Sequence, residues 1–262
     1  MIRVRSLKRN FLGVILVVAI SGCFSSPRFL PQGVSFDADR GSRECLAIKA
    51  KQQGAYTSYR ALVEAVVVGE GATFRYALAS RDSLNTRIDV LPPEGAFTLG
   101  IFVVRDGEAS FVDVAQKRYR MQCTPEDLYQ EFFQIEGLSP QLVTALLTGV
   151  IPLDSCSDID VYYAEDGKIL TLLDRKHNLA WSVDYQSGEL RSVTLLNDEN
   201  SRVVIRARRT MSEQGLPRID MSIFKPIAMT LELTTKRLHV GVELPASLFS
   251  IYIPRAYHRE SC

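Results

Sequence analysis

The residues with the most distinctive chemistry in this sequence are five cysteines and three histidines. His177, His239 and His258 lie far apart in the chain, and no two cysteines have the C-x-x-C spacing of a redox motif or zinc site. HExxH, GxSxG, P-loop and GxGxxG motifs do not occur in the sequence. The sequence therefore predicts a protein that is not an enzyme, with no metal site and no cofactor. A hydrolase whose carboxylates and histidines meet only in the fold stays open as an alternative.

The first cysteine, Cys23, ends a secretion signal. Four Arg and Lys residues within the first nine positions precede the apolar run Phe11–Ile20, which is shorter than the roughly 20 residues that span a bilayer. Ile20-Ser21-Gly22-Cys23 resembles the bacterial lipobox, which implies cleavage after Gly22 and a diacylglycerol on Cys23. Residues 1–22 are thus expected to be a lipoprotein signal peptide, and acyl chains on Cys23 to hold the mature chain at a membrane. An ordinary secretion signal with an incidental cysteine is the alternative.

The charge balance of the mature chain argues against nucleic acid as a partner. The signal removes four of the 31 basic residues, so 27 remain against 30 acidic residues, a net charge near −3. Such a balance gives no electrostatic reason to bind a polyanion. The composition, 46% hydrophobic and 23% charged, is that of an ordinary folded protein with one core.

Residues 23–41 are expected to form the acylated cysteine and a flexible tether. Pro27, Pro31, Gly33 and Gly41 interrupt this stretch, and no apolar periodicity survives in it. A flexible segment of about 18 residues has an r.m.s. span of roughly 25 Å. Residues 42–262 would then form a single globular domain held just off the membrane.

The globular part is predicted to begin with one helix and to continue as β-strands. Ser42 is positioned to cap a helix that stops near Gly54. Alternating apolar residues then predict a meander of about six strands, with Asp106-Gly107 as a tight hairpin turn. Both faces of the strand Phe97–Val104 are apolar, which predicts either core packing on both sides or a cavity wall on one side.

Two helices are expected after this first run of strands. Thr124-Pro125 and Ser139-Pro140 each place a capping residue before a proline, a combination that favours the start of a helix. The apolar stripes of the two helices include Leu128, Phe132, Leu142 and Leu146.

Strand periodicity resumes at Asp160, with Asp166-Gly167 as a second hairpin turn. Strands at this spacing predict one large antiparallel sheet, curved or closed, in a single domain. Arg206, Arg208 and Arg209 lie together on one of these strands. We interpret them as a solvated strand face, with a contact to lipid headgroups as the alternative.

The four remaining cysteines form an even set in an oxidising compartment, which predicts two disulfides. Cys123 and Cys156 flank the two predicted helices, so a Cys123–Cys156 bridge would close the helical hairpin. Cys45 and Cys262 are then paired by elimination, with the first helix packing beside the end of the chain. Four free buried thiols are the alternative.

A series of short motifs in a fixed order resembles the LolA/LolB superfamily of lipoprotein-handling proteins of the bacterial envelope. The resemblance runs from about Ser42 to Pro254. Its motifs are Arg87–Gly95, Asp106-Gly107, Val112-Asp113, Tyr119, Thr124–Leu128, Leu146–Gly149, Val242–Pro245, Phe249 and Pro254. The resemblance implies a mainly β fold: a single half-open antiparallel β-barrel with an N-terminal helix and a two-helix lid over an apolar concave side.

The concave side in this superfamily holds acyl chains, which need apolar area and little hydrogen bonding. The resemblance therefore implies a lipid or acylated ligand. The candidate lid contacts are Leu128, Phe132, Leu142 and Leu146, and the candidate cavity walls are Phe97, Leu99 and Trp181. All seven are equally compatible with plain core packing.

One departure from the superfamily lies in the loop Pro92–Gly95. LolB-type receptors have an exposed leucine there that hands cargo into the membrane, whereas this sequence has Glu94, and a carboxylate does not enter hydrocarbon. We therefore expect an outer-membrane lipoprotein that faces the periplasm, binds a lipid or acylated ligand and differs from LolB in activity. Phe24 stands where an Asp would signal retention in the inner membrane. An envelope sensor or scaffold that uses the same fold to bind other envelope proteins is the alternative.

Overall fold

The computed structural model describes residues 26–262, except 32, 54–57, 83, 96, 126, 130–137, 154, 198, 200 and 226–227. Within these residues one 15-stranded sheet contains all the strands. The strands are β1 Val34–Ser35, β2 Tyr59–Val67, β3 Thr73–Asp82, β4 Asn85–Leu91, β5 Gly100–Arg105, β6 Glu108–Asp113, β7 Arg118–Cys123, β8 Ile159–Tyr163, β9 Ile169–Asp174, β10 Leu179–Asp184, β11 Leu190–Leu196, β12 Val203–Met211, β13 Pro217–Ile223, β14 Met229–Val240 and β15 His258–Arg259.

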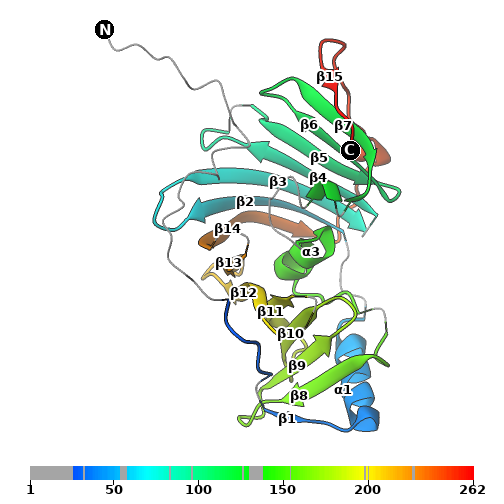
Figure 1. Cartoon of the computed structure of the whole chain (residues 1–262), viewed down its shortest axis with the longest axis vertical. Helices are drawn as coiled ribbons and strands as arrows, with labels where there is room; N and C mark the ends of the chain where they lie inside the picture. Colours follow the sequence, from blue (N-terminus) through cyan, green and yellow to red (C-terminus); the bar gives the residue numbers. More distant parts are fainter. Residues whose placement is uncertain are drawn as a thin grey trace.

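The sheet consists of two antiparallel meanders joined edge to edge. Strands β2–β7 form one meander and β8–β14 the other, and the pairing of β14 with β2 makes them continuous. The sheet is open and strongly curved, with helices on its concave side (Figure 1). The predicted fold class, a mainly β half-open barrel with helices, is thereby confirmed.

Two longer helices accompany the sheet: α1, Ala38–Lys51, and α3, Pro140–Thr148. Helix α3 starts as the sequence predicts, because the Ser139 hydroxyl accepts from the Leu142 N–H at 3.2 Å and Pro140 occupies the first turn. It ends at Gly149, whose φ of 81° lies in the left-handed region. Residues 125 and 127–129 are also helical, while Phe132 lies outside the described residues. None of the helices in the described ranges is long and apolar enough to cross a membrane.

The first helix begins earlier than predicted. Its N-cap is Asp37, whose carboxylate accepts from the Arg40 N–H at 2.8 Å, so the predicted cap Ser42 lies inside the helix. Gly41 is buried against β8, where an added Cβ would meet Val161 at 3.6 Å. This glycine allows close packing of α1 on the strand and does not interrupt the helix.

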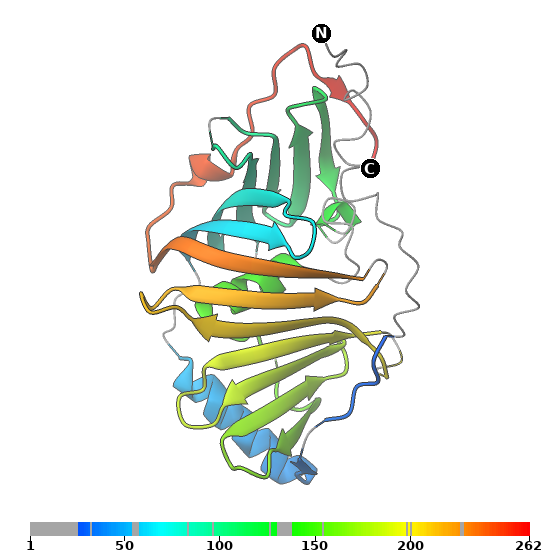
Figure 2. The same cartoon turned by 90° about the vertical axis from the view of Figure 1, so that its left-hand side faces the viewer.

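The predicted flexible tether is wrong for the described residues between 26 and 41. Pro27 and Phe29 bond to the start of β12: the Val203 N–H donates to the Pro27 carbonyl, and the Phe29 N–H donates to the Ser201 carbonyl, both at 2.9 Å. Strand β1 then pairs with β8. Figure 2 shows this segment in dark blue along one set of strand ends. Prolines and glycines prevent regular long elements here, but they do not prevent short pairings with an existing sheet.

The helices and the chain ends cover opposite faces of the sheet. The main apolar core lies on the concave face, and it includes buried residues of α1, α3 and most strands. On the convex face Leu244 and Phe249 pack over β5, and Phe29 packs over β9–β12. Strand β5 is therefore buried on both sides, as its apolar pattern predicts, with Phe102 in the concave core and Val103 in the convex one.

The predicted disulfide pairing is also wrong. The bridges are Cys45–Cys156 and Cys123–Cys262. Cys123 ends β7 and Cys156 precedes β8, and these two strands lie near opposite ends of the sheet, so a Cys123–Cys156 bridge is geometrically excluded. Helix α1 packs on β8 and brings Cys45 to Cys156, while β15 runs parallel to β7 and carries Cys262 to Cys123.

Candidate functional site

The largest cluster of buried apolar side chains among the described residues lies on the concave face of the sheet. Cross-strand neighbours on this face are apolar over many strands, because β alternation places every second residue there. One row contains Val193, Ala207, Met221, Leu231 and Val67, and the next contains Ile219, Leu233, Ala65 and Phe74.

Helix α3 crosses this face and packs against β11 and β13 (Figure 1). Leu142 and Leu146 are each 1% exposed, so the helix buries its apolar side fully on the sheet. Its end is held by Arg209 of β12, whose Nε donates to the Leu146 carbonyl at 3.0 Å. Burial lowers the pKa of the Arg209 guanidinium from its ordinary value, and the carboxylate of Glu189 opposes this.

Arg209 corrects part of one sequence interpretation. Arg206 and Arg208 are exposed, as expected of a solvated strand face, but Arg209 points the other way and is only 7% exposed. Because successive side chains of a strand point to opposite faces, the sequence alone predicts that Arg209 points away from Arg206 and Arg208. The partner, a carbonyl at the end of a distant helix, could not be found in the sequence.

Part of the concave face is only half-buried. We call these residues the central strip, because they lie on the middle strands β14, β2 and β3, where the two meanders join. The central strip comprises Met229, Leu231, Leu233, Val67, Phe74 and Tyr76. Apolar side chains that remain partly accessible inside a concave sheet form a surface on which an acyl chain can lie.

A group of hydroxyls lies next to the central strip. The Tyr59 hydroxyl of β2 lies 3.3 Å from Thr144 Oγ1 of α3, and Thr144 itself donates to the Pro140 carbonyl at 2.9 Å. Burial raises the pKa of Tyr59 to about 12, although its hydrogen bond with Thr144 lowers this pKa. Burial also raises the pKa of Tyr76 to about 12. The pKa of Tyr129 is raised well above its ordinary value by burial and by the charges of Tyr59 and Tyr76. These tyrosines are neutral at physiological pH, so they offer hydrogen bonds and no base.

The predicted cavity residues fall into two groups. Leu128, Leu142, Leu146 and Trp181 all lie in the concave core, with exposures of 1–3%. The Nε1 of Trp181 has no hydrogen-bond partner among the described residues. The sequence therefore predicted the correct face for these four, and their contact with a ligand stays a prediction.

Phe97 and Leu99 do not lie on the concave wall. Strand β5 begins only at Gly100, so Phe97 is in the preceding loop and is 60% exposed. Leu99 lies on the same side of the chain as Ile101, which packs on the convex face against the C-terminal segment. Alternation correctly grouped Leu99 with Ile101 and Val103 but wrongly included Phe97, and the sequence contained no signal for which face was concave.

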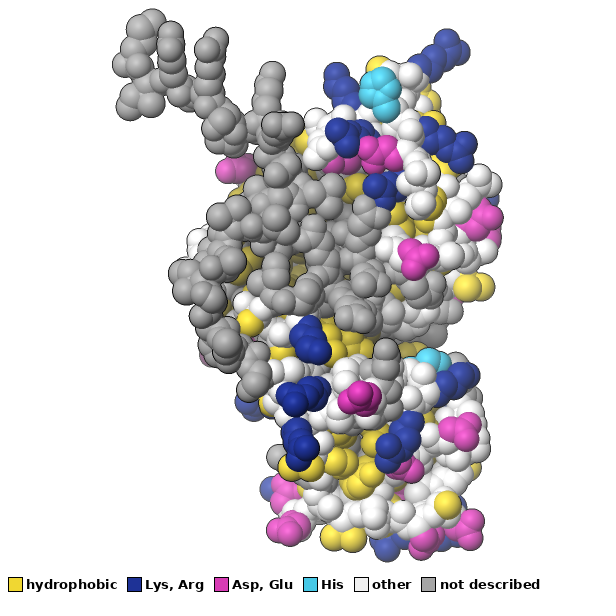
Figure 3. Space-filling view, viewed as in Figure 1, with side chains coloured by type: hydrophobic (Ala, Val, Ile, Leu, Met, Phe, Trp, Pro, Cys, Tyr) yellow, Lys and Arg dark blue, Asp and Glu magenta, His cyan; other side chains and the backbone are white. Residues whose placement is uncertain are grey.

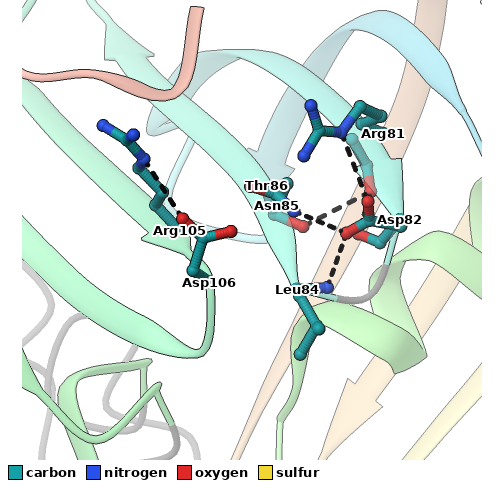
Figure 4. A network of polar contacts seen from close by, with 8 residues as sticks. Arg81, Asp82, Leu84, Asn85, Thr86, Arg105 and Asp106 are labelled. Carbon is teal, nitrogen blue, oxygen red and sulfur yellow. Dashed lines mark hydrogen bonds and ion pairs between the residues drawn. The ribbon is translucent and has the colours of Figure 1, made fainter. Parts of the chain in front are cut away.

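The polar contacts at the rim of the sheet are structural. In the β3–β4 hairpin the Asp82 carboxylate accepts from the Leu84 N–H and from Asn85 Nδ2, both at 2.9 Å, and pairs with Arg81 (Figure 4). Burial would raise the pKa of Asp82, but these hydrogen bonds lower it below its usual value. The neighbouring β5–β6 hairpin has its own pair, Arg105–Asp106, beside the predicted Asp106-Gly107 turn.

One histidine–carboxylate pair lies within hydrogen-bond distance. His177 Nδ1 is 2.7 Å from Asp174 Oδ2, and the same carboxylate accepts from the His177 N–H. Both residues belong to the β9–β10 turn, and no hydroxyl or thiol of the described residues is hydrogen-bonded to His177. The described residues also contain no group of three or more potential metal ligands. The pair therefore stabilises its turn.

Comparison with known proteins rests on structure. No protein-family model matches the sequence, and no curated protein matches it. A DUF1329 family protein from Desulfovibrio piger is 13% identical, with a TM-score of 0.53, over 81% of this chain and 97% of that chain. At that identity the similarity shows a shared fold and nothing about a ligand. This chain therefore shares the fold of that DUF1329 family protein.

Two further solved structures are similar over a comparable share of the chain. A LolA superfamily protein from Nitrosomonas europaea is 12% identical, with a TM-score of 0.49, over 79% of this chain and 97% of that chain. A domain described as that of an outer-membrane lipoprotein-sorting protein, from Vibrio parahaemolyticus, is 12% identical, with a TM-score of 0.49, over 81% and 97%.

Proposed function

We propose that this protein is a lipid-anchored component of the bacterial envelope that binds the acyl chain of a lipid or acylated protein on the concave face of its LolA/LolB-like sheet. The observation that carries this proposal is the central strip. Its residues are apolar except for one tyrosine hydroxyl, and they stay half-buried on adjacent middle strands of the sheet, beside a core of fully buried residues. An apolar surface that the protein itself leaves half-covered favours an apolar ligand.

The hydroxyls beside the central strip narrow the ligand class. Each methylene of a bound chain contributes about 0.8 kcal/mol on leaving water, which needs no directional contact. Tyr76 belongs to the strip, and its hydroxyl and that of Tyr59 lie close enough to Tyr129 to raise the pKa of Tyr129. Neutral hydroxyls suit the carbonyl of an ester or amide at the head of an acyl chain. A free fatty acid, whose carboxylate would have to be buried, fits less well.

The proposed location in the cell envelope follows from the predicted acylation of Cys23. Diacylglycerol on Cys23 holds the protein at one membrane face, and Phe24 after it favours the outer membrane and the periplasmic side. The partners are then the membrane and the acylated ligand, with no nucleic acid. The protein acts as a receptor or binding protein and catalyses no reaction.

Analysis of co-purified lipids tests the ligand. We expect mass spectrometry of the gently purified full chain to find acyl lipids, and Leu231→Asn to lose most of them. The matched control is Thr230→Asn, because Thr230 is the exposed neighbour of Leu231 and points to the opposite face. Equal lipid content in the two variants, or no lipid in the unaltered protein, contradicts the proposal.

A sensor or scaffold of the envelope is the second candidate. It is favoured by one observation: α3 fills the concave face over β11 and β13, where Leu142 and Ala145 are fully buried. A protein that uses this fold only as a platform needs no open ligand surface. Chemical cross-linking in intact cells tests it, and recovery of membrane lipid with no protein partner counts against it.

A further inference from the structure

The N-terminal segment is fixed to the sheet almost as soon as it leaves the anchor. Ser26 is 7% exposed, its hydroxyl donates to the Val203 carbonyl, and its own carbonyl accepts from Arg202 Nη1 at 3.2 Å. Arg28 forms an antiparallel bridge with Arg202. The chain is therefore held at the start of β12 from its first described residue.

This attachment sets the distance between the domain and the membrane. Only three residue steps separate Cys23 from Ser26, and three steps of extended chain cover at most about 11 Å. The inference rests on the proposed acylation of Cys23. Given that anchor, the surface around Ser26 lies next to the lipid headgroups, because the chain has no length to hold it further away.

The surface around Ser26 has the composition of a membrane-contacting surface. Leu30, in the short segment between Ser26 and β1, is 76% exposed, and Val34, the first residue of β1, is 68% exposed. Arg28, between Ser26 and Leu30, is exposed as well. Exposed leucine and valine beside exposed arginine is the combination that partitions into the interface of an anionic bilayer.

Basic residues from the sheet extend this surface. Arg206 is exposed on the convex face of β12, and its cross-strand neighbours, Thr194 and Ser222, are uncharged. Lys225 is exposed beside the start of β12, since the preceding Phe224 N–H donates to the Val204 carbonyl at 2.8 Å. Figure 3 shows Lys and Arg side chains in the lower half of this view and others at its top.

The local positive charge is opposite in sign to the net charge expected for the mature chain. Arg206 and Lys225 have no ion-pair partner among the described residues. Glu199 is the nearest described acid in the turn before β12, and it accepts from the Ser201 hydroxyl at 3.4 Å. On the neighbouring strand Asp220 already pairs with Arg218 at 3.6 Å. Arg206 and Lys225 therefore keep unpaired positive charges on the described surface, although the expected mature chain has a net charge near −3.

We propose that Arg28, Leu30, Val34, Arg202, Arg206 and Lys225 form an anchor-side patch that docks on anionic phospholipid headgroups. Each basic residue near such a surface raises membrane affinity by about fivefold, and the effect falls off within a Debye length of about 8 Å. The short link holds Ser26 within about 11 Å of Cys23, which is comparable to that length. The patch fixes the orientation of the half-barrel, because the acyl chains and the basic side chains both act near the start of β12.

Tryptophan fluorescence tests the contact on the acylated mature protein in vesicles. The chain has one tryptophan, Trp181, which is 1% exposed, so a second one reports its own surroundings. We expect Leu30→Trp to be quenched by brominated lipids in phosphatidylglycerol-containing vesicles. The matched control is Tyr252→Trp, because Tyr252 is 86% exposed and follows the 3₁₀ helix Ala246–Phe249 over β4 and β5, at the other end of the sheet.

Charge reversal tests the headgroup contact. Adding Arg28→Glu and Arg206→Glu to Leu30→Trp should lower affinity for anionic vesicles more than tenfold in the non-acylated form, while Arg255→Glu, at an exposed position far from the patch, should not. If the protein floats with vesicles but the two reporter positions are quenched equally, the proposed docking of the patch is wrong, whereas the acyl anchor is still supported. Protein with an unmodified Cys23 by intact mass, which does not float, overturns the anchor and the patch together.

Discussion

The disulfide Cys45–Cys156 is expected to be a major source of stability, and its removal is a quantitative test of the fold. The change is the double variant Cys45→Ala and Cys156→Ala. Alanine is the suitable replacement because both sulfurs are buried in the concave core, at 0% and 7% exposure, and a serine hydroxyl there would lack a partner.

The magnitude follows from the chain that the bridge closes. The two cysteines are 111 residues apart, and loop-closure entropy for that length corresponds to about 4.8 kcal/mol at 25 °C. The second bridge, Cys123–Cys262, spans 139 residues and overlaps the first over 123–156, so it still restricts the unfolded chain. We therefore expect a smaller loss, about 3 to 4 kcal/mol in the free energy of unfolding.

Denaturant unfolding without reductant provides the measurement. Trp181 is a suitable probe because it is the only tryptophan and is buried in the same core. The control is the double variant Cys123→Ala and Cys262→Ala. The bridge that it removes closes a loop of similar length, so the entropic effect should be similar, but this bridge lies at the other end of the sheet. Hydrogen exchange should then increase in α1 for the first variant only.

Two results would refute this reasoning. A loss below about 1 kcal/mol for the Cys45/Cys156 variant would mean that the bridge does not restrict the unfolded chain as its span requires. Non-reducing peptide mapping that finds Cys123 linked to Cys156 would contradict the arrangement of β7 and β8 at opposite ends of the sheet.

Three further predictions concern single side chains. Because burial raises the folded-state pKa of Tyr59 from 10.0 to about 12, the stability that its neutral phenol contributes is complete below pH 10 and is lost as pH rises through 12. Denaturation curves of Tyr59→Phe should lack this pH-dependent loss, which amounts to about 3 kcal/mol in the unaltered protein. Arg209→Met should destabilise by about 2 kcal/mol and speed hydrogen exchange in α3, since the Leu146 carbonyl loses its charged donor; unchanged exchange would contradict this. Phe249→Ala should cost about 3 kcal/mol in chemical denaturation and expose the convex face of β5 to proteolysis, whereas Ser250→Ala should not.

Features encoded by local chemistry could be predicted from the sequence. The start of α3 needs only Ser139 and Pro140, and its end needs only Gly149. The hairpin at Asp106-Gly107 needs two positive φ angles, which are 52° and 85° in the structure. Such signals act over a few residues, so they are independent of the rest of the fold.

Features that depend on which distant segments meet could not be predicted. The joining of β14 to β2 sends β7 and β8 to opposite ends of the sheet, and this alone decides the cysteine pairing. The segment after Ser26 looked like a tether because Pro27 and Pro31 exclude regular structure, yet the open strand ends of the sheet supplied partners for its backbone. The face of β5 that is concave depends in the same way on the curvature of the whole sheet.

The N-terminal segment, α1 and the Cys45–Cys156 bridge together have a mechanical consequence. Ser26 is bonded to β12, β1 is paired with β8, and α1 is covalently linked to the chain just before β8. Because of these three attachments, the described chain between Ser26 and α1 is fixed to the sheet at successive points. If acyl chains on Cys23 are embedded in a membrane, a force on the anchor is therefore transmitted to the sheet directly. A domain on an 18-residue tether could tilt freely, but this one is expected to present its central strip at a fixed angle to the lipid surface.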